Sequence, residues 1–315
     1  MLQRSGAFGM KSVLPVLSVI AAIMLVWVLA VVPMNMHLTA DQAQRDGLAV
    51  FPDTPAARQD YSGLGLSIRN PQLIGLTYVL ERPRLPSPHQ VVGEMWKTTV
   101  GARITSKRSL VYHGWVTLSA TLLGFAIGTT LGILLAVGIV FNRAMDMSVM
   151  PWAIASQTIP ILALAPMIIV MLGAIGIQGL LPKAIISAYL SFFPVVVGMV
   201  KGLRSPDAMQ LDLLRTYHAS PAQGFWKLRL PASVPYLFAS LKIGISASLV
   251  GAIVAELPTG ARAGFGARML VGDQYGQPLV TWAALFAAAI TAAALVGFFS
   301  AVERFTLRRM GMAAA

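Results

Sequence analysis

Side chains that commonly carry chemistry in proteins are few and scattered in this sequence. There is no cysteine, which excludes disulfides, thiolate zinc sites and cysteine nucleophiles. No His-Glu-x-x-His, Gly-x-Ser-x-Gly or Gly-x-x-x-x-Gly-Lys-Ser/Thr motif is present. We therefore expect no catalytic residue, no metal site and no cofactor or ATP held by this chain. The four histidines are His37, His89, His113 and His218.

One ionisable residue lies near the end of a long apolar run. Glu256 is in a position where ionisable side chains usually face a bundle interior or a cavity. It could form a gate or a structural hydrogen bond, contact a solute directly, or lie exposed at an interface. Gln157 and Ser246 are weaker pathway candidates, because polar side chains in such runs often bond their own helix.

The composition indicates a membrane protein. Of 315 residues, 56% are hydrophobic and 11% are charged, whereas a soluble domain carries about a quarter charged residues. The net charge of +12 points to cytoplasmic loops and anionic lipid, and we expect no nucleic-acid partner.

Six apolar runs are long enough to cross a bilayer, which needs about 20 residues of helix. We expect an all-α membrane protein with about six transmembrane helices. The first run is too long for a signal peptide and lacks a small-residue cleavage site, so we interpret it as an anchor. The runs are Val13–Met34, Gly114–Phe141, Met150–Leu172, Leu181–Val200, Val234–Leu257 and Leu279–Ala301.

Basic residues predict the orientation. Eleven lie in short segments that are cytoplasmic if both termini are inside, against three in the short outer loops. The eleven are Arg4, Lys11, Arg143, Lys201, Arg204, Arg215, Lys227, Arg229, Arg304, Arg308 and Arg309, and the three are Lys183, Arg262 and Arg268.

The order of apolar and polar stretches predicts four regions. Residues 1–34 form an anchor helix, and residues 35–112 form a periplasmic or interfacial region. Residues 113–309 form a transmembrane core that contains a polar loop at 201–232, and residues 310–315 form a tail. Within the second region, residues 35–84 could be a periplasmic cap, a contact for a soluble partner or a partly ordered linker.

Small residues and prolines interrupt several runs. Gly124, Gly128 and Gly132 fall on one helix face, where two backbones can approach closely. Ordinary packing within one bundle and the lining of a moving pathway both remain open. Prolines such as Pro160 and Pro166 free backbone carbonyls, which favours a transporter over a mere anchor.

The polar segment from Lys201 to Pro231 mixes apolar and polar residues at helical spacing. Ser220, Pro221 and Gln223 match a helix start with a capping box, so we expect two short helices outside the membrane. Their exposed ridge would dock into a groove on a partner. The alternative is an interfacial amphipathic loop without a partner.

This segment resembles the "EAA loop" of permease subunits of bacterial ATP-binding-cassette (ABC) importers. Anchored on Leu230-Pro231, the family's acidic position falls on Asp212 and its glycine on His218. Histidine tolerates positive φ better than most side chains, so the turn can survive. The resemblance implies that the ATPase-coupling residues are Asp212, Leu213, Leu214, His218, Ala219, Leu228, Leu230 and Pro231.

The resemblance covers about Leu85 to Arg309 and is closest to permeases of the nitrate, sulfonate and taurine type. Leu85-Pro86-Ser87-Pro88, Ala255-Glu256-Leu257 and Gly264-Phe265-Gly266 resemble that group's stretches. The amino-acid sequence from Trp226 to Tyr236 most resembles that of a branch linked to pyrimidine, thiamine-precursor or riboflavin uptake.

The resemblance implies a type I ABC importer permease in a bacterial inner membrane. It would pair with a second, usually identical copy, two cytoplasmic ATPase subunits that bind ATP, and a periplasmic solute-binding protein. An ion-coupled secondary transporter is an alternative, although no run has a central carboxylate, and a membrane scaffold is another.

Overall fold

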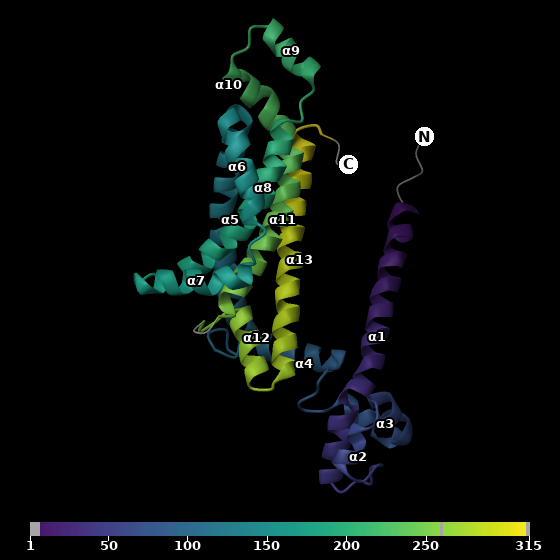
Figure 1. Cartoon of the computed structure of the whole chain (residues 1–315). Coiled ribbons are helices and arrows are strands. Elements are labelled where there is room, and N and C mark those ends of the chain that lie inside the picture. Colours follow the sequence, from purple (N-terminus) through teal and green to yellow (C-terminus); the bar gives the residue numbers. More distant parts are fainter. Residues whose placement is uncertain (1–6, 259–260, 313–315) are drawn as a thin grey trace. The chain divides into compact units, whose positions relative to one another are not determined.

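The computed structural model describes residues 7–258 and 261–312, and all regular secondary structure in these ranges is helical (Figure 1). The predicted all-α membrane fold is confirmed. Among the described residues, five continuous helical segments are long and apolar enough to cross a membrane, and a sixth crossing is possible if one sharply bent helix pair counts as a span. The α-helices are α1 (Ala7–Arg45), α2 (Pro55–Gln59), α3 (Gly63–Arg69), α4 (Pro88–Thr99), α5 (Leu110–Phe141), α6 (Arg143–Ser156), α7 (Ile161–Ala174), α8 (Leu180–Leu203), α9 (Ala208–Thr216), α10 (Pro221–Gly224), α11 (Leu230–Glu256), α12 (Phe265–Gln274) and α13 (Pro278–Arg309).

The chain divides into two compact units, and each is described by itself. The first unit comprises the residues up to Gly101 together with Val271–Ala283. The second comprises Ala102–Leu270 together with the residues from Ala284 onward. Both units therefore contain part of the long helix α13.

Helices α5, α8 and α11 form the centre of the second unit (Figure 1). Small residues let them approach closely: a Cβ atom added to Gly132 would lie 2.9 Å from Phe192 O. Gly124 and Gly128 likewise face Ser187 and Ser191, so the glycine face of α5 packs on α8. These contacts make α5 parallel to α8, while Gly251, which lies against Ser187, belongs to an antiparallel α11.

Because α5 and α8 are parallel, the chain between them must travel back across the bundle. Helix α6 begins at an N-cap formed by Asn142, and its Trp152 ring lies 6.3 Å from that of Phe192 on α8. Helix α7 then packs Ala165 against Ile186 and Ala255. The bent pair α6 and α7 thus completes the return, which accounts for the sixth predicted crossing.

The prediction of one continuous span over Met150–Leu172 was wrong. The chain bends by 97° between α6 and α7. Pro160 has no N–H to donate to the carbonyl of Ser156, and a proline also keeps the preceding residue out of the helical conformation. The hydroxyl of Tyr189 donates to that free carbonyl instead, so the break is satisfied inside the protein.

In the first unit, α1 changes character along its length. Apolar side chains from Leu14 to Leu29 are largely exposed, whereas Val31 and Met36 are fully buried. The predicted anchor Val13–Met34 therefore lies within a longer helix whose second half enters a folded region. Asn35 ties that half to the following loops through its amide, which donates to Thr77 O at 3.1 Å.

The residues after α1 have a core of their own. Met36 and Ala40 pack with Val50, Leu66 and Leu73. The buried guanidinium of Arg58 lies 2.6 Å from Asp41, and it also donates to the side chain of Gln44. A packed core and a satisfied buried charge are features of a folded region rather than of a partly ordered linker.

Candidate functional site

The polar segment between α8 and α11 forms a helical hairpin at one end of the second unit's bundle (Figure 1). Helix α9 starts with a capping box between Asp207 and Gln210. Helix α10 starts with the predicted capping box, in which Ser220 N donates to Gln223 Oε1 at 2.8 Å. The expected pair of short helices is therefore confirmed.

His218 forms the turn between the two short helices. Its φ is +53°, the left-handed conformation that glycine adopts most readily. The amide of His218 donates to Arg215 O at 2.9 Å, and that of Ala219 donates to Leu214 O at 3.0 Å. These two bonds define a Schellman motif with histidine at the usual glycine position. The turn survives the substitution that sets this sequence apart from the family pattern.

We expect His218→Gly to stabilise this turn and His218→Val to destabilise it, because a β-branched residue is costly at positive φ. The left-handed conformation costs an L-residue roughly 1–2 kcal/mol, so amide exchange should change at least ~5-fold. Hydrogen exchange of the peptide covering residues 214–224 measures the effect. Equal exchange rates in the two variants would contradict this account of the turn.

One face of α9 is apolar and uncovered. Met209, Leu213 and Tyr217 follow one another at four-residue spacing and are 78%, 57% and 77% exposed. Asp212 flanks this stripe and forms an exposed ion pair with Arg215 at 2.9 Å. Met209 and Tyr217 were not among the predicted coupling residues, although their spacing with Leu213 was a signal in the sequence.

The other predicted coupling residues hold the hairpin rather than form its exposed face. Leu214, Ala219, Leu228, Leu230 and Pro231 are all partly buried. Leu228 lies in a π-helical turn, Phe225–Arg229, that precedes α11. Pro231 cannot donate to the carbonyl four residues earlier, which explains why the helix widens here.

The base of the hairpin is tied to the bundle by arginines. Arg229 donates to Leu203 O at the end of α8, at 2.9 Å, and its guanidinium lies over the ring of Phe141 at the end of α5. Arg204 pairs with Asp146 on α6 at 2.9 Å. A force on the hairpin would therefore act on several long helices together.

A second polar cluster surrounds Glu256 at the opposite end of α11. The Glu256 side chain is fully buried and lies 3.3 Å from Nζ of Lys183 on α8. It accepts hydrogen bonds from Thr117 Oγ1 on α5 and from Gly266 N on α12. The cluster thus joins α5, α8, α11 and α12, and the burial of Glu256 excludes the alternative of an exposed position at an interface.

The same cluster fastens the loop that follows α11. Lys183 Nζ also donates to Ala263 O at 3.0 Å, and Gly264 N donates to His113 Nδ1 at 3.0 Å. The amide of Phe265 donates to Thr117 Oγ1 at 2.9 Å. Sequence reasoning treated Lys183 only as an outer-loop charge, and it missed Thr117 as a partner of Glu256.

The other two pathway candidates do not join this cluster in the structure. Ser246 donates to Lys242 O on its own helix at 3.1 Å, and it lies ten residues from Glu256 along α11. Gln157 is the C-cap of α6 at the bend before α7. Their roles in a pathway stay predictions.

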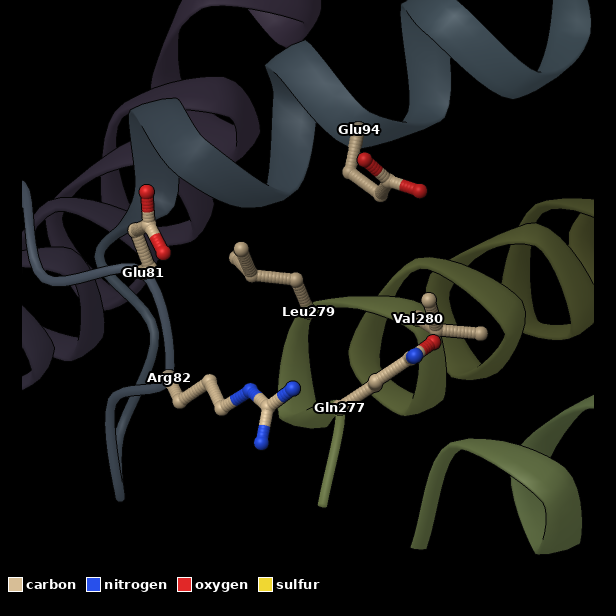
Figure 2. Close-up of a pocket in the computed structure, with 6 residues that line it drawn as sticks. All are labelled: Glu81, Arg82, Glu94, Gln277, Leu279 and Val280. Carbon is tan, nitrogen blue, oxygen red and sulfur yellow. The ribbon is translucent and has the colours of Figure 1, made fainter. Parts of the chain in front are cut away.

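A shallow pocket in the first unit lies between the loop before α4, α4 itself and the start of α13. Figure 2 shows Glu81, Arg82 and Glu94 facing Gln277 and Leu279 across it. Both signs of charge line this pocket, so it does not favour a solute of one charge.

Long apolar helices and a helical hairpin at one end of their bundle are features of membrane transport permeases. More particularly, residues 128–311 match the family described as "Binding-protein-dependent transport system inner membrane component". Because this match covers more than half of the chain, the protein belongs to that family.

Three similar relatives agree with this assignment. The chain is 31% identical to a probable ABC transporter permease of Haemophilus influenzae over 64% of this chain and 76% of the relative. It is 32% identical to the formylaminopyrimidine transport permease of Halalkalibacterium halodurans, over 62% and 71%. It is 30% identical to the riboflavin transport permease of Chloroflexus aurantiacus, over 71% and 80%.

Proposed function

We propose that the chain is the membrane-spanning subunit of an ATP-driven importer that moves a small solute from the periplasm to the cytoplasm. The observation that carries this proposal is the α9–α10 hairpin, which presents an exposed apolar stripe and is bonded to α5, α6 and α8 at its base. A rigid protruding element of this kind suits a partner that pushes on the spans.

The partners follow from the hairpin and the family. A pair of cytoplasmic ATPase subunits, which bind the ATP, would receive the stripe formed by Met209, Leu213 and Tyr217. A second copy of the chain would complete the pathway, and a periplasmic solute-binding protein would deliver the solute. The family and the exposed stripe support this arrangement, since an uncovered row of apolar side chains is typical of an interaction site.

Charge supports an orientation with the hairpin and both termini in the cytoplasm of a bacterium. Lys201, Arg204, Lys227 and Arg229 lie in or beside the hairpin, and basic residues concentrate on the cytoplasmic side of membrane proteins. At the opposite end of α11, Lys183 is paired with Glu256, so it is not an uncompensated outer charge.

The relatives favour one solute class. Two of them, at 32% and 30% identity, are named for formylaminopyrimidine and riboflavin transport, whereas relatives named for aliphatic sulfonates and nitrate are 24% and 26% identical; this difference favours a small heterocyclic solute over nitrate, a sulfonate or taurine.

Reconstitution tests the energy source. The complex is purified from its native membranes through a tag on this chain and placed in liposomes with the binding protein and labelled heterocyclic solutes. We expect uptake only with ATP on the hairpin side, unaffected by ionophores. Uptake driven by an imposed proton or sodium gradient without the ATPase would overturn the proposal in favour of a secondary transporter. A chain that inserts stably but carries no solute under either drive would favour a scaffold.

A further inference from the structure

Helix α4 in the first unit is amphipathic and is covered on one side only. Val91 and Thr98 on its inner side are buried, and Gln90 Nε2 donates to Leu80 O at 2.9 Å. On its outer side, Val92, Trp96 and Val100 recur at four-residue spacing and are 65%, 68% and 61% exposed. An apolar stripe with a large aromatic residue at its centre needs a cover.

We propose that α4 lies flat on the lipid bilayer, with Val92, Trp96 and Val100 inserted at the boundary between headgroups and acyl chains. Helices with an apolar stripe, a polar opposite face and low net hydrophobicity bind membranes in this way. The proposal needs only that the chain spans a membrane, and it does not rest on the proposed transport function.

Helix α1 fixes the level of α4 relative to the bilayer. Its bare apolar surface extends from Leu14 to about Leu29, over which a helix rises about 23 Å, most of the thickness of the hydrocarbon core. Just before this point, Trp27 Nε1 donates to Pro86 O at 2.9 Å. Since α4 begins at Pro88, its first turn lies where α1 leaves the membrane.

Two further tryptophans, Trp282 and Trp96, are consistent with a bilayer boundary near Trp27. The ring of Trp27 stacks on that of Trp282, with centroids 5.3 Å apart. Tryptophan is enriched where membrane proteins cross from acyl chains to headgroups. Trp96, exposed on a helix that starts beside Trp27, is placed to extend the same belt.

Charge and connectivity favour lipid over a protein partner. The exposed basic residues Lys97, Arg103 and Lys107 follow the stripe or flank it, and they suit anionic headgroups. In addition, α5, a candidate span, begins at Leu110, ten residues after Val100. Ten extended residues reach at most about 35 Å, so the covalent chain keeps the end of α4 within that distance of the start of this candidate span.

Single cysteines report the environment of the stripe, because the natural chain has none. Val92→Cys, Trp96→Cys and Val100→Cys are spin-labelled in the full-length protein in vesicles of phosphatidylethanolamine and phosphatidylglycerol. Collision with oxygen marks lipid, and collision with a water-soluble nickel chelate marks solvent. Val19→Cys on the exposed part of α1 is the lipid control, and Gln59→Cys on α2 is the water control.

We expect the three stripe labels to collide with oxygen nearly as often as the Val19 label and to be shielded at least ~5-fold from nickel relative to the Gln59 label. Lys97→Cys, one residue from Trp96, should collide with nickel more often than Trp96→Cys. Nickel access at the stripe equal to that at Gln59 would overturn the proposal. So would immobile labels that neither reagent reaches, which would mean that a protein covers the stripe.

Discussion

Leu213→Asp is expected to abolish ATP-driven uptake while the protein still inserts into the membrane at a normal level. Leu213 is the middle residue of the exposed stripe on α9 and is 57% exposed, so the change removes little packing inside the chain. In a docked complex, however, it would place a carboxylate in an apolar contact. Loss of a central interface residue of this kind typically weakens the free energy of binding by about 2 kcal/mol or more, which is a factor of ~30 in affinity.

Ala208→Asp is the matched control. It adds the same charge to the same helix, but at an exposed position outside the stripe and in the first turn, where a carboxylate is favourable. The measurements are solute uptake in proteoliposomes and binding of the purified ATPase to each variant. Normal uptake by Leu213→Asp, or equal loss in both variants, would contradict docking through the stripe.

An acidic residue in the same segment offers a second comparison. Asp212→Lys should also impair uptake, because it reverses the charge beside the stripe and repels Arg215, with which Asp212 now pairs at 2.9 Å. Leu214→Lys should do so by a different route, since the Leu214 side chain is partly buried within the hairpin and a charged side chain there must turn out to solvent. Only the Leu214 variant should loosen the hairpin in hydrogen exchange. Equal exchange in both variants would contradict this division of roles.

The hairpin could be predicted in detail because its determinants are local. Ser220, Pro221 and Gln223 form a capping box within four residues, and histidine tolerates the left-handed turn at position 218. The break at Pro160 was equally local but was missed, because hydropathy measures side chains and ignores the missing backbone donor. Exposure, which marks Met209 and Tyr217 as surface residues, depends on what the rest of the fold leaves uncovered.

The partner of Glu256 could not be derived from spacing. Lys183 is 73 residues away in sequence, and only the packing of α8 against α11 brings the two together. A buried carboxylate in an apolar bundle does predict that some cation is nearby. It does not say which of the outer basic residues supplies it, and charge counting assigned Lys183 to the loops.

Breaking this ion pair is expected to have the largest effect on stability. Glu256→Gln keeps the size of the side chain and an oxygen for Thr117 and Gly266, but leaves Lys183 without its countercharge at a site where the two side chains are 0% and 12% exposed. Removing one partner of a buried pair typically costs about 3–5 kcal/mol. Lys183→Met should be comparably harmful. We expect both single variants to have a lower Tm in detergent.

The double variant Glu256→Gln, Lys183→Met separates charge pairing from the other contacts. It leaves no unpaired charge, so it should be more stable than either single variant, and a double-mutant cycle gives the coupling. If the double variant loses as much stability as the two single variants lose together, the two side chains do not interact as a pair. Hydrogen exchange should locate the remaining damage in residues 261–270, because Lys183 also donates to Ala263 O.

Transport by the double variant decides whether the cluster is only structural. If it serves the fold alone, uptake should recover together with Tm. If it is a gate that holds the loop after α11 against α5 and α8, the stable double variant should still transport abnormally. In that case we expect the double variant to leak solute without ATP, because Lys183 no longer holds Ala263. The rest of the loop would stay in place, since Gly264 and Phe265 keep their hydrogen bonds to His113 and Thr117. The gate role stays a prediction, and this measurement tests it at the cluster that joins the ends of α5, α8 and α11 to the loop after α11.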